Sequence, residues 1–335
     1  MANNSNLQSL TTVDHHIAAE ESMHPEATGE FTSLLHDLML AIRIISREVR
    51  RAGVNDILGI TDTINVHGES QQKLDIYSNE IIKKSLIQGG HVCAIATEED
   101  QEITVVGTDK DKKYIILLDP LDGSSNINLN ITIGTIFGIY RRQESPQTPF
   151  TKSNVLQKGR NLIAGGYALY GSSTILVYTT GNGVHSFTYD PTIGEFLLSR
   201  QNIRIPRRGP YYSINEGYYH YWDDNIRQFV DFIKTPSSDG NYPMSSRYVG
   251  TLIADFHRTL IAGGIFLYPK DKTHPNGKLR HVYEANPLSL VIEQAGGIAI
   301  NGDQNILDIE PATVHARTPL FLGSPDNMAD LMKFL

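Results

Sequence analysis

Cysteine is almost absent from the sequence, in which Cys93 is the single cysteine among 335 residues. A single cysteine excludes an internal disulfide bond, and its position in the apolar run 91–97 predicts a buried, unreactive thiol. No apolar stretch approaches the ~20 residues that span a bilayer, and residues 1–6 lack the basic start and apolar core of a secretion signal. We therefore expect a cytoplasmic protein that has no membrane partner.

Basic residues are also fewer than acidic residues. The chain has 29 Lys and Arg against 37 Asp and Glu, which gives a formal net charge of −8 at pH 7. Nucleic-acid-binding faces are strongly basic, whereas the basic residues here cluster only locally, as at 110–113, 141–142 and 204–208. We therefore exclude nucleic acid as a partner and expect a small molecule. An anionic substrate would need bound metal ions and a few placed cations to attract it.

The apolar residues change between helical and strand-like spacing, which predicts an α/β (α+β) fold of layered sheets and helices. Leu34, Leu38 and Ile42 belong to a strongly periodic helix with Thr28 as its candidate N-cap. Further helices are predicted at 73–88, 223–234, 251–262 and 285–295. Strand-like runs lie at 91–97, 114–119, 133–140, 162–170, 174–180, 184–189, 265–268 and 298–300.

The chain is long enough for two domains. Residues 1–27 are polar and rich in His and Glu, which predicts a flexible N-terminal arm. Two prolines and a glycine within 205–210 predict a boundary between a first domain, 28–205, and a second domain, 206–335. The stretch 51–72 is punctuated by glycines and is long for a structureless loop, and such loops are usually functional or disordered.

Two of the apolar runs end in pairs of carboxylates. Glu98 and Glu99 follow the first run, and Asp119 and Asp122 close the second. Such runs are typical of buried strands, and ligands bind at the carboxyl ends of strands in open α/β sheets. If the two strands are neighbours, the four acids repel one another unless cations lie between them. Oxygen ligands of this kind favour Mg²⁺ or Mn²⁺, so we predict a metal site.

The segments around these acids suit a phosphate group. Residues 123–126, Gly-Ser-Ser-Asn, offer free N–H groups at a helix start. Glu284 precedes an apolar helix, near the positive end of its dipole, and Lys278 and Arg280 lie just upstream. Each feature also has a plainer interpretation: a turn at 119–126, a solvated charge cluster after the first run, a favourable first-turn Glu, and surface cations. The match between the two acid-tipped runs favours the site.

Taken together, these segments resemble class I fructose-1,6-bisphosphatase, of the lithium-sensitive, Mg²⁺-dependent sugar phosphatase superfamily. The resemblance extends from about residue 28 to the last helix. It implies a layered α/β/α/β/α fold with two domains, an AMP-binding regulatory domain that carries most metal ligands and a substrate-binding domain. Unrelated segments carry the resemblance in one order and at consistent spacing: 28–30, 73–79, 98–100, 119–126, 133–141, 166–171, 213–218, 247–250, 264–269 and 277–287.

The resemblance implies an activity, the hydrolysis of the 1-phosphate of D-fructose 1,6-bisphosphate by metal-activated water in gluconeogenesis. Two or more Mg²⁺ ions per subunit, which Mn²⁺ can replace, would bridge the phosphate oxygens. The implied metal ligands are Glu98, Asp119, the main-chain carbonyl of Leu121, Asp122 and Glu284. Asp75 and Glu99 would polarise the attacking water. Glu69, where relatives often have Asp, would assist from the loop 51–72.

The resemblance also implies contacts to both phosphates of the substrate. Those to the 1-phosphate are Asp122, Gly123, Ser124 and Ser125. Those to the 6-phosphate are Asn215, Tyr218, Tyr248 and Tyr268, with Lys278 on the sugar and phosphate and Arg247 reaching a neighbouring active site in a homotetramer. Tyrosine hydroxyls are neutral donors and bind phosphate without burying further charge. Any one of the 16 tyrosines, taken alone, is more simply a packing residue.

AMP is implied as an inhibitory effector. The matching residues are Thr28, Gly29, Glu30, Phe31, Thr32, Lys113, Tyr114 and Arg141. A helix N-terminus with a Lys and an Arg suits a phosphate, although Thr-Gly-Glu alone would be ordinary capping. Phe31 stands where relatives often have a smaller aliphatic residue, and the loop 51–72 corresponds to the family's mobile loop, an order–disorder switch. The segment 142–150 has no cysteine, so thiol switching is not expected.

Two other functions stay open at this point. A phosphatase for a related sugar bisphosphate, such as sedoheptulose 1,7-bisphosphate, would use the same catalytic groups. A non-catalytic nucleotide sensor would keep the AMP site and lose turnover. Against the sensor, every implied side-chain metal ligand is still a carboxylate.

Overall fold

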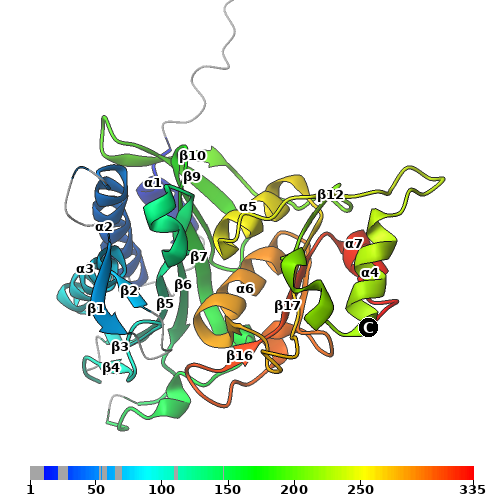
Figure 1. Cartoon of the computed structure of the whole chain (residues 1–335). Coiled ribbons are helices and arrows are strands. Elements are labelled where there is room, and N and C mark those ends of the chain that lie inside the picture. Colours follow the sequence, from blue (N-terminus) through cyan, green and yellow to red (C-terminus); the bar gives the residue numbers. More distant parts are fainter. Residues whose placement is uncertain are drawn as a thin grey trace, which may run out of the picture.

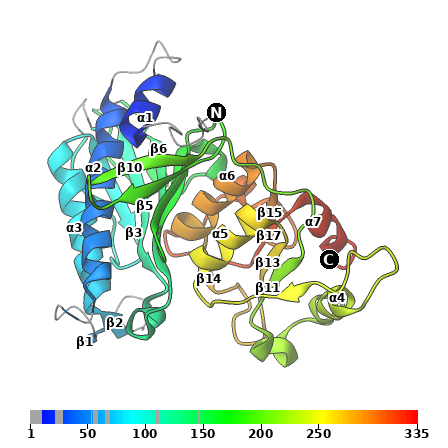
Figure 2. The same ribbon diagram turned by 90° about the horizontal axis from the view of Figure 1, so that it is seen from above.

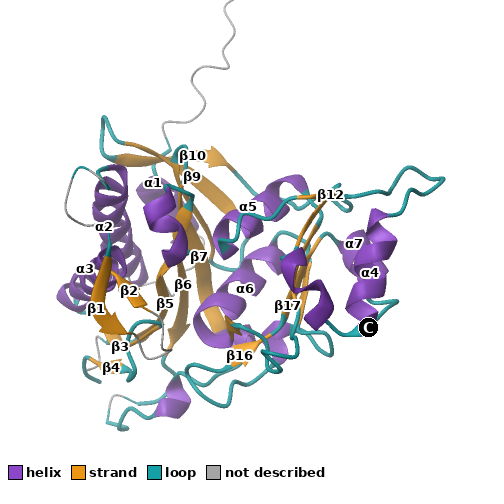
Figure 3. Cartoon of the chain, in the orientation of Figure 1, coloured by secondary structure: helices purple, strands orange, loops and turns teal. Residues whose placement is uncertain are grey.

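The computed structural model describes residues 11–21, 29–52, 54, 59–64, 70–108, 112–145 and 147–335. Within these residues, helices and sheets alternate in five layers, which Figure 2 shows from left to right as helices, the large sheet, helices, the small sheet and helices. Figure 3 shows the same alternation by type of element. The layered α/β/α/β/α arrangement confirms the predicted fold class.

The large sheet has the strand order β10-β9-β8-β7-β6-β5-β3-β4 (Figure 1). Strands β3 and β5 run parallel, and the other neighbours in this order run antiparallel. The bounds are β3 Val92–Thr97, β4 Thr104–Val105, β5 Tyr114–Asp122, β6 Ile133–Arg141, β7 Leu162–Tyr170, β8 Thr174–Thr179, β9 His185–Asp190 and β10 Glu195–Arg200.

Helices cover the outer face of the large sheet. The buried stripe of the longest one includes Leu34, Leu38 and Ile42, which share an apolar cluster with Phe137 and Ile139 of the sheet. The helical spacing of these apolar residues in the sequence therefore reflects burial of one helix face. The three helices are α1 (Val13–Glu21), α2 (Glu30–Arg50) and α3 (Lys73–Gly89).

The small sheet has the order β12-β11-β13-β17-β15, with bounds β11 Tyr211–Ser213, β12 Ser245–Ser246, β13 Ile265–Tyr268, β15 Ile298–Ile300 and β17 Leu320–Gly323. Between the two sheets lie α5 (Leu252–Ala262) and α6 (Asn286–Gln294), and the far face is covered by α4 (Asp224–Lys234) and α7 (Pro325–Leu331). Helix α6 approaches the large sheet closely, because a Cβ at Gly138 would lie only 2.9 Å from Pro287 Cγ. Glycine at this strand position lets the helix reach the sheet.

Short elements complete the described chain. Two further antiparallel pairs are β1 (Ile60–Ile64) with β2 (Ser70–Gln72) and β14 (Leu279–Arg280) with β16 (Arg317–Thr318). The 3₁₀ turns are η2 (Ser124–Leu129), η3 (Lys152–Asn154), η4 (Gly159–Asn161), η5 (Glu216–Tyr221) and η7 (Ile306–Asp308). A π-turn, η6 (His281–Ala285), leads directly into α6.

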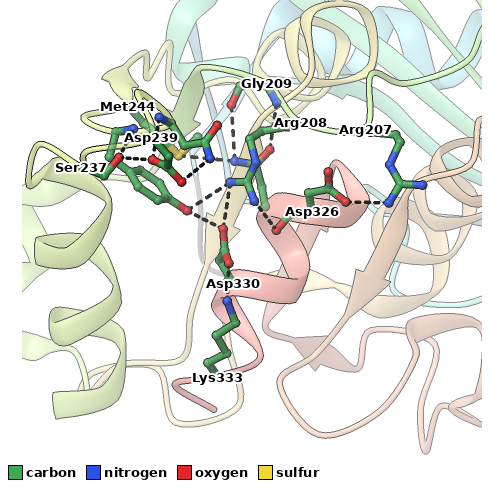
Figure 4. A network of polar contacts seen from close by, with 12 residues as sticks. Arg207, Arg208, Gly209, Ser237, Asp239, Met244, Asp326, Asp330 and Lys333 are labelled. Carbon is green, nitrogen blue, oxygen red and sulfur yellow. Dashed lines mark hydrogen bonds and ion pairs between the residues drawn. The ribbon is translucent and has the colours of Figure 1, made fainter.

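A polar network holds α7 against the segment that follows the large sheet (Figure 4). Asp330 of α7 accepts hydrogen bonds from Arg208 Nη1 at 2.8 Å and from Lys333 Nζ at 2.6 Å. Burial alone would raise the pKa of Asp330, but the hydrogen bonds from Lys333, Tyr242 and Arg208 outweigh it and the pKa is lowered. Asp330 is therefore a fixed negative charge in this contact.

Part of the predicted flexible arm is instead a packed helix. Residues 13–21 form α1, and its Val13 and Ile17 are buried. Two apolar residues one turn apart are enough to hold a short helix on the core, but they give little periodicity in a polar stretch. Residues 1–10 and 22–28 lie outside the described part of the chain.

Two other local predictions need correction. The N-cap of α2 is Gly29, whose φ is 73°, whereas the predicted cap, Thr28, lies outside the described residues. The stretch 51–72, predicted as a loop, contains the antiparallel pair β1 and β2, and its residues 65–69 are not described. Residues 60–64 lack the strict alternation of apolar and polar residues that marks a strand.

The thiol prediction is confirmed, because Cys93 is free and fully buried. Burial raises its pKa to about 11, so the reactive thiolate is scarce at neutral pH. None of the helices in the described part of the chain is long and apolar enough to span a membrane.

Candidate metal and phosphate site

The two acid-tipped runs are neighbouring parallel strands. Thr97 of β3 pairs with Leu118 of β5, and the backbone N–H of Glu98 donates to Leu118 O at 3.0 Å. Glu98 directly follows β3, and Asp119 follows Leu118 within β5. The two acids therefore lie next to each other at the carboxyl end of this strand pair, where ligands bind in α/β sheets. The condition on which the metal-site prediction depends, that the two strands are neighbours, is therefore met.

A third carboxylate joins them from the second half of the chain. Glu284 lies in the π-turn η6, and its side chain accepts a hydrogen bond from the backbone N–H of Arg280. One ligand atom from each of Glu98, Asp119 and Glu284 lies within 4.8 Å of the other two. We call these three residues the carboxylate cluster. π-turns occur frequently at functional sites.

Asp119 lies at the most buried point of this cluster. The residue is only 2% exposed. Oδ1 accepts a hydrogen bond from Leu121 N at 3.0 Å, whereas Oδ2 is buried and has no hydrogen-bond partner among the described residues. Burial, followed by the charges of Glu98, Asp122 and Glu284, raises the pKa of Asp119 well above its usual value. A divalent cation would supply the missing partner, and carboxylate oxygens are the ligands that Mg²⁺ and Mn²⁺ prefer.

Asp122 connects the end of β5 to the start of α5. Its Oδ2 accepts a hydrogen bond from Ile253 N at 2.7 Å. Burial raises the pKa of Asp122 to about 7, against the lowering effect of the N–H groups of Ile253 and Leu252. The next residue, Gly123, has a φ of 90°, and a Cβ there would lie 2.7 Å from Thr251 Cγ2. Glycine is therefore required to turn the chain into η2 at this edge.

Asp75 reaches the same edge from α3. Its Oδ2 accepts a hydrogen bond from Gln72 N at 2.9 Å, which forms half of a capping box. Its Oδ1 accepts a hydrogen bond from Ser124 Oγ, also at 2.9 Å. The helix start therefore fixes one oxygen of the Asp75 carboxylate, and the other oxygen orients the Ser124 hydroxyl. Ser124 belongs to residues 123–125, which are predicted to contact the 1-phosphate and which we call the phosphate cradle.

These residues line a single pocket of about 470 Å³. The predicted site residues in its wall are Asp75, Glu98, Glu99, Asp119, Leu121, Asp122, Gly123, Ser124, Ser125, Tyr248, Tyr268, Lys278 and Glu284. Asn215 and Tyr218 line a second hollow, and Tyr268 and Lys278 line both. The residues predicted for the metal ions and for the two phosphates are thus contiguous.

Four further polar residues line the wall. Gln72, Thr251 and Asp255 are not singled out by the sequence, which leaves Arg280 open as either a phosphate contact or a surface cation. Asp255 is fully buried and accepts hydrogen bonds from Val249 N and Gly250 N at 3.1 Å, so it shapes the loop before α5. Arg280 is buried, and its Nε lies 3.5 Å from Glu98 Oε1. It offsets the charge of the cluster and is not a surface cation. Gln72 and Arg280 end the short strands β2 and β14, but none of the four residues follows a long apolar run. The pattern that revealed Glu98 and Asp119 therefore does not mark them.

Some predicted residues do not line the pocket. Arg247 is exposed, and its guanidinium lies 5.5 Å from the ring centre of Tyr211. Glu69 and Thr28 lie outside the described residues.

The described residues of the predicted AMP site gather at the start of α2. Lys113 Nζ lies 2.6 Å from Glu30 Oε2, and the rings of Phe31 and Tyr114 are 5.7 Å apart between centroids. Arg141 is the cross-strand partner of Tyr114. The lysine expected to face a phosphate is therefore paired with a carboxylate in this structure.

The layered fold, the carboxylate cluster and the neighbouring phosphate cradle together define a divalent-metal-dependent phosphatase. Residues 11–201 match the family described as "Fructose-1-6-bisphosphatase, N-terminal domain", and residues 205–335 match "Fructose-1-6-bisphosphatase, C-terminal domain". The chain belongs to the fructose-1,6-bisphosphatase family.

Curated relatives and solved structures agree with this assignment. The chain is 49% identical over 322 residues to the class 1 fructose-1,6-bisphosphatase of Chlorobium chlorochromatii (strain CaD3), covering 96% of this chain and 97% of the relative. It is 50% identical over 319 residues to that of Chloroherpeton thalassium (strain ATCC 35110 / GB-78), covering 95% and 91%. The holo form of Leishmania major fructose-1,6-bisphosphatase superposes with a TM-score of 0.91 at 37% identity, covering 97% of this chain and 98% of that one.

Proposed function

We propose that this chain hydrolyses D-fructose 1,6-bisphosphate to fructose 6-phosphate and phosphate, in gluconeogenesis and carbohydrate metabolism. The observation that carries the proposal is the carboxylate cluster, in which Asp119 Oδ2 is buried without a partner among the described residues. The cluster lies in one pocket with the phosphate cradle at 123–125. The names of the relatives support the same substrate.

The pocket suits two or more Mg²⁺ ions, with Mn²⁺ as a substitute. Glu98, Asp119, Asp122, Glu284 and the carbonyl of Leu121 would hold them. When bound, the ions would neutralise phosphate charge and lower the pKa of a water molecule. The support is the donor set itself, because these residues present oxygen ligands and no imidazole or thiolate.

The chain's own groups would position the reacting atoms. Glu99 and Asp75 line the pocket and would orient the attacking water. Ser124 donates its hydroxyl to Asp75, so its oxygen is already held at the cradle where the 1-phosphate would lie. Glu69 is proposed to assist, and an unchanged turnover rate in Glu69→Gln would remove that role.

The second phosphate would bind across the two hollows. Tyr268 and Lys278 line both, so a ligand in one hollow meets residues of the other. Burial raises the pKa of Tyr248 to about 12 and also raises that of Tyr268. Both hydroxyls therefore stay neutral and can donate hydrogen bonds to a phosphate. A related sugar bisphosphate is discriminated only by this part of the pocket.

The test is phosphate release from fructose 1,6-bisphosphate across Mg²⁺ concentrations, with EDTA as a control and the sugar product identified. Glu98→Gln is expected to lower turnover by about 100-fold or more, while Glu102→Gln, an exposed glutamate four positions on, leaves it unchanged. Faster release from sedoheptulose 1,7-bisphosphate would change the substrate. No release from either substrate by a folded protein would favour the nucleotide sensor.

AMP inhibition, a homotetramer and a cytoplasmic location belong to the same proposal. The gathering of Glu30, Phe31, Lys113, Tyr114 and Arg141 at the start of α2 supports an anion site there. Arg247 is exposed, as a residue that reaches a neighbouring subunit must be before assembly. The AMP site is tested by inhibition that is present in the wild type and lost in Arg141→Ala. Light scattering tests the tetramer, and cell fractionation tests the location. Each can fail without removing the phosphatase.

A further inference from the structure

A second cluster of metal-ligating side chains lies away from the pocket, between the first helix and the edge region of the large sheet. Helix α1 carries His16 and Glu20 four residues apart, so both lie on one face of the helix. His185 begins β9. One ligand atom from each of these three residues lies within 4.8 Å of the other two. Among the described residues, only the carboxylate cluster meets the same criterion.

His185 is the residue that points to a ligand. It is 5% exposed, and its Nε2 is buried without a hydrogen-bond partner among the described residues. The nearest acid oxygen, Glu20 Oε1, lies 3.7 Å away, which is too far for a hydrogen bond. Buried polar nitrogens are nearly always satisfied. A cation between the ring nitrogen and the carboxylate would satisfy both.

In each of the other two side chains, the atom that would not bind the metal makes a hydrogen bond to the protein, as is usual for metal ligands. His16 is 7% exposed, and its Nδ1 lies 2.8 Å from the Tyr178 hydroxyl, which leaves Nε2 as its ligand atom. Thr180 Oγ1 donates to Glu20 Oε2 at 3.0 Å, which leaves Oε1 facing His185. When His185 binds through Nε2, its proton moves to Nδ1 and the long contact of 3.4 Å from Asn202 N is given up.

We propose that His16, Glu20 and His185 bind one Zn²⁺ ion that clasps α1 to β9. Two imidazoles and one carboxylate form a donor set that Zn²⁺ accepts, with water as the fourth ligand. Imidazole ligands also separate this site from the carboxylate cluster, whose oxygen ligands suit Mg²⁺.

The ion would change how firmly the N-terminal helix is held. In the described residues, α1 is fixed on the core by Val13 and Ile17, and the ion would add a cross-link to a strand far away in the sequence. Because the site exists only in the folded chain, Zn²⁺ binding must raise stability. At a free Zn²⁺ concentration about 100-fold above the dissociation constant, we expect the melting temperature to rise by about 4 °C.

The test titrates the full-length protein with Zn²⁺ in excess Mg²⁺, which occupies oxygen-ligand sites without competing for imidazole. Binding is followed by thermal melting and by the visible absorption of Co²⁺ used in place of Zn²⁺. The variants are His16→Gln and His185→Gln. The matched control is His15→Gln, because His15 is exposed on the same helix. Mg²⁺-dependent phosphatase activity and the melting temperature without Zn²⁺ show that each variant is folded.

The expected result is one tight equivalent and the same rise in melting temperature for wild type and His15→Gln, with both lost in His16→Gln and His185→Gln. Binding that survives in either folded histidine variant would overturn the proposal. So would the absence of tight binding by the wild type in excess Mg²⁺. Loss of the signal in Glu98→Gln, with retention in His185→Gln, would assign the ion to the carboxylate cluster instead.

Discussion

The carboxylate cluster is expected to destabilise the protein when no divalent cation is bound. Asp119 has the most unfavourable position, because it is buried and faces Glu98 and Glu284. Asp119→Asn removes the charge at nearly constant volume, and its amide group can donate to the facing carboxylates. We therefore predict that this variant, measured in EDTA, is more stable than the wild type although it loses activity.

The magnitude follows from the geometry. Two full charges 4.8 Å apart, the outer limit of the cluster, repel by about 3.5 kcal/mol at an effective dielectric constant of ~20. The raised pKa of Asp119 means that a bound proton relieves part of this repulsion as the pH falls towards the folded pKa. We expect a net stabilisation of about 1–2 kcal/mol, or about 1.5–3 °C in melting temperature.

The pH dependence has a definite sign. The pKa of Asp119 is raised in the folded protein, whereas the unfolded chain titrates near its usual value of ~3.9. The folded state therefore binds the proton more tightly, and the wild type loses stability as the pH rises from about 4 through the folded pKa. Asp119→Asn lacks this loss, so its advantage in EDTA should grow with pH.

The assay is thermal or urea unfolding in EDTA at several pH values between 4 and 8, compared with unfolding in Mg²⁺. Asp303→Asn, an exposed aspartate, is the control for removing one charge. Mg²⁺ should stabilise the wild type more than it stabilises Asp119→Asn. The reasoning is refuted if Asp119→Asn is no more stable than Asp303→Asn in EDTA, or if its advantage does not increase with pH.

Three further predictions concern the rest of the fold. Asp330→Asn should lower the free energy of unfolding in urea by about 2 kcal/mol at pH 7, because Arg208 loses its charged partner. Since the pKa of Asp330 is lowered, this difference from wild type should vanish as the pH falls below the folded pKa. A difference that persists at low pH would contradict the prediction. Gly138→Ala should cost about 1–3 kcal/mol, because its Cβ would lie 2.9 Å from Pro287 Cγ; unchanged unfolding would show that α6 can move away. Cys93, with its pKa raised to about 11, should react with a thiol reagent at pH 8 only on unfolding, and rapid labelling of the native protein would refute its burial.

The acid-tipped strands could be predicted from the sequence because both constraints are local. A short apolar run specifies a strand buried on both faces, and the acids that end it must then lie at the sheet edge. The order of the strands is not local, yet β3 and β5 proved to be neighbours, with Thr97 paired to Leu118. Burial on both faces restricts such runs to the centre of a sheet, which made this pairing the simplest arrangement.

The remaining parts of the site depend on tertiary contacts that no local pattern records. Arg280 is a pocket residue because the π-turn brings it to Glu98, and Asp255 is one because it holds the loop before α5. Helix α1 could not be predicted for another reason. Its only buried apolar residues are Val13 and Ile17, which give no clear helical periodicity. In the sequence, His16 and Glu20 are part of a polar stretch. Only the tertiary structure shows that His185 of β9 lies beside them.

The packing of α5 between the sheets sets the geometry of the phosphate cradle. Asp122 is hydrogen-bonded to Ile253 N at the first turn of α5, Asn126 bonds the Thr251 hydroxyl just before it, and Gly123 lies against the same threonine. The cradle is therefore fixed by a helix that packs on the large sheet, where Ile253 approaches Gly134 and the ring of Phe256 lies edge-on to that of Tyr167. The same helix shares one apolar cluster with Phe266 of the small sheet. A shift of one sheet relative to the other would have to move α5 and would disturb Asp122 and Gly123 together.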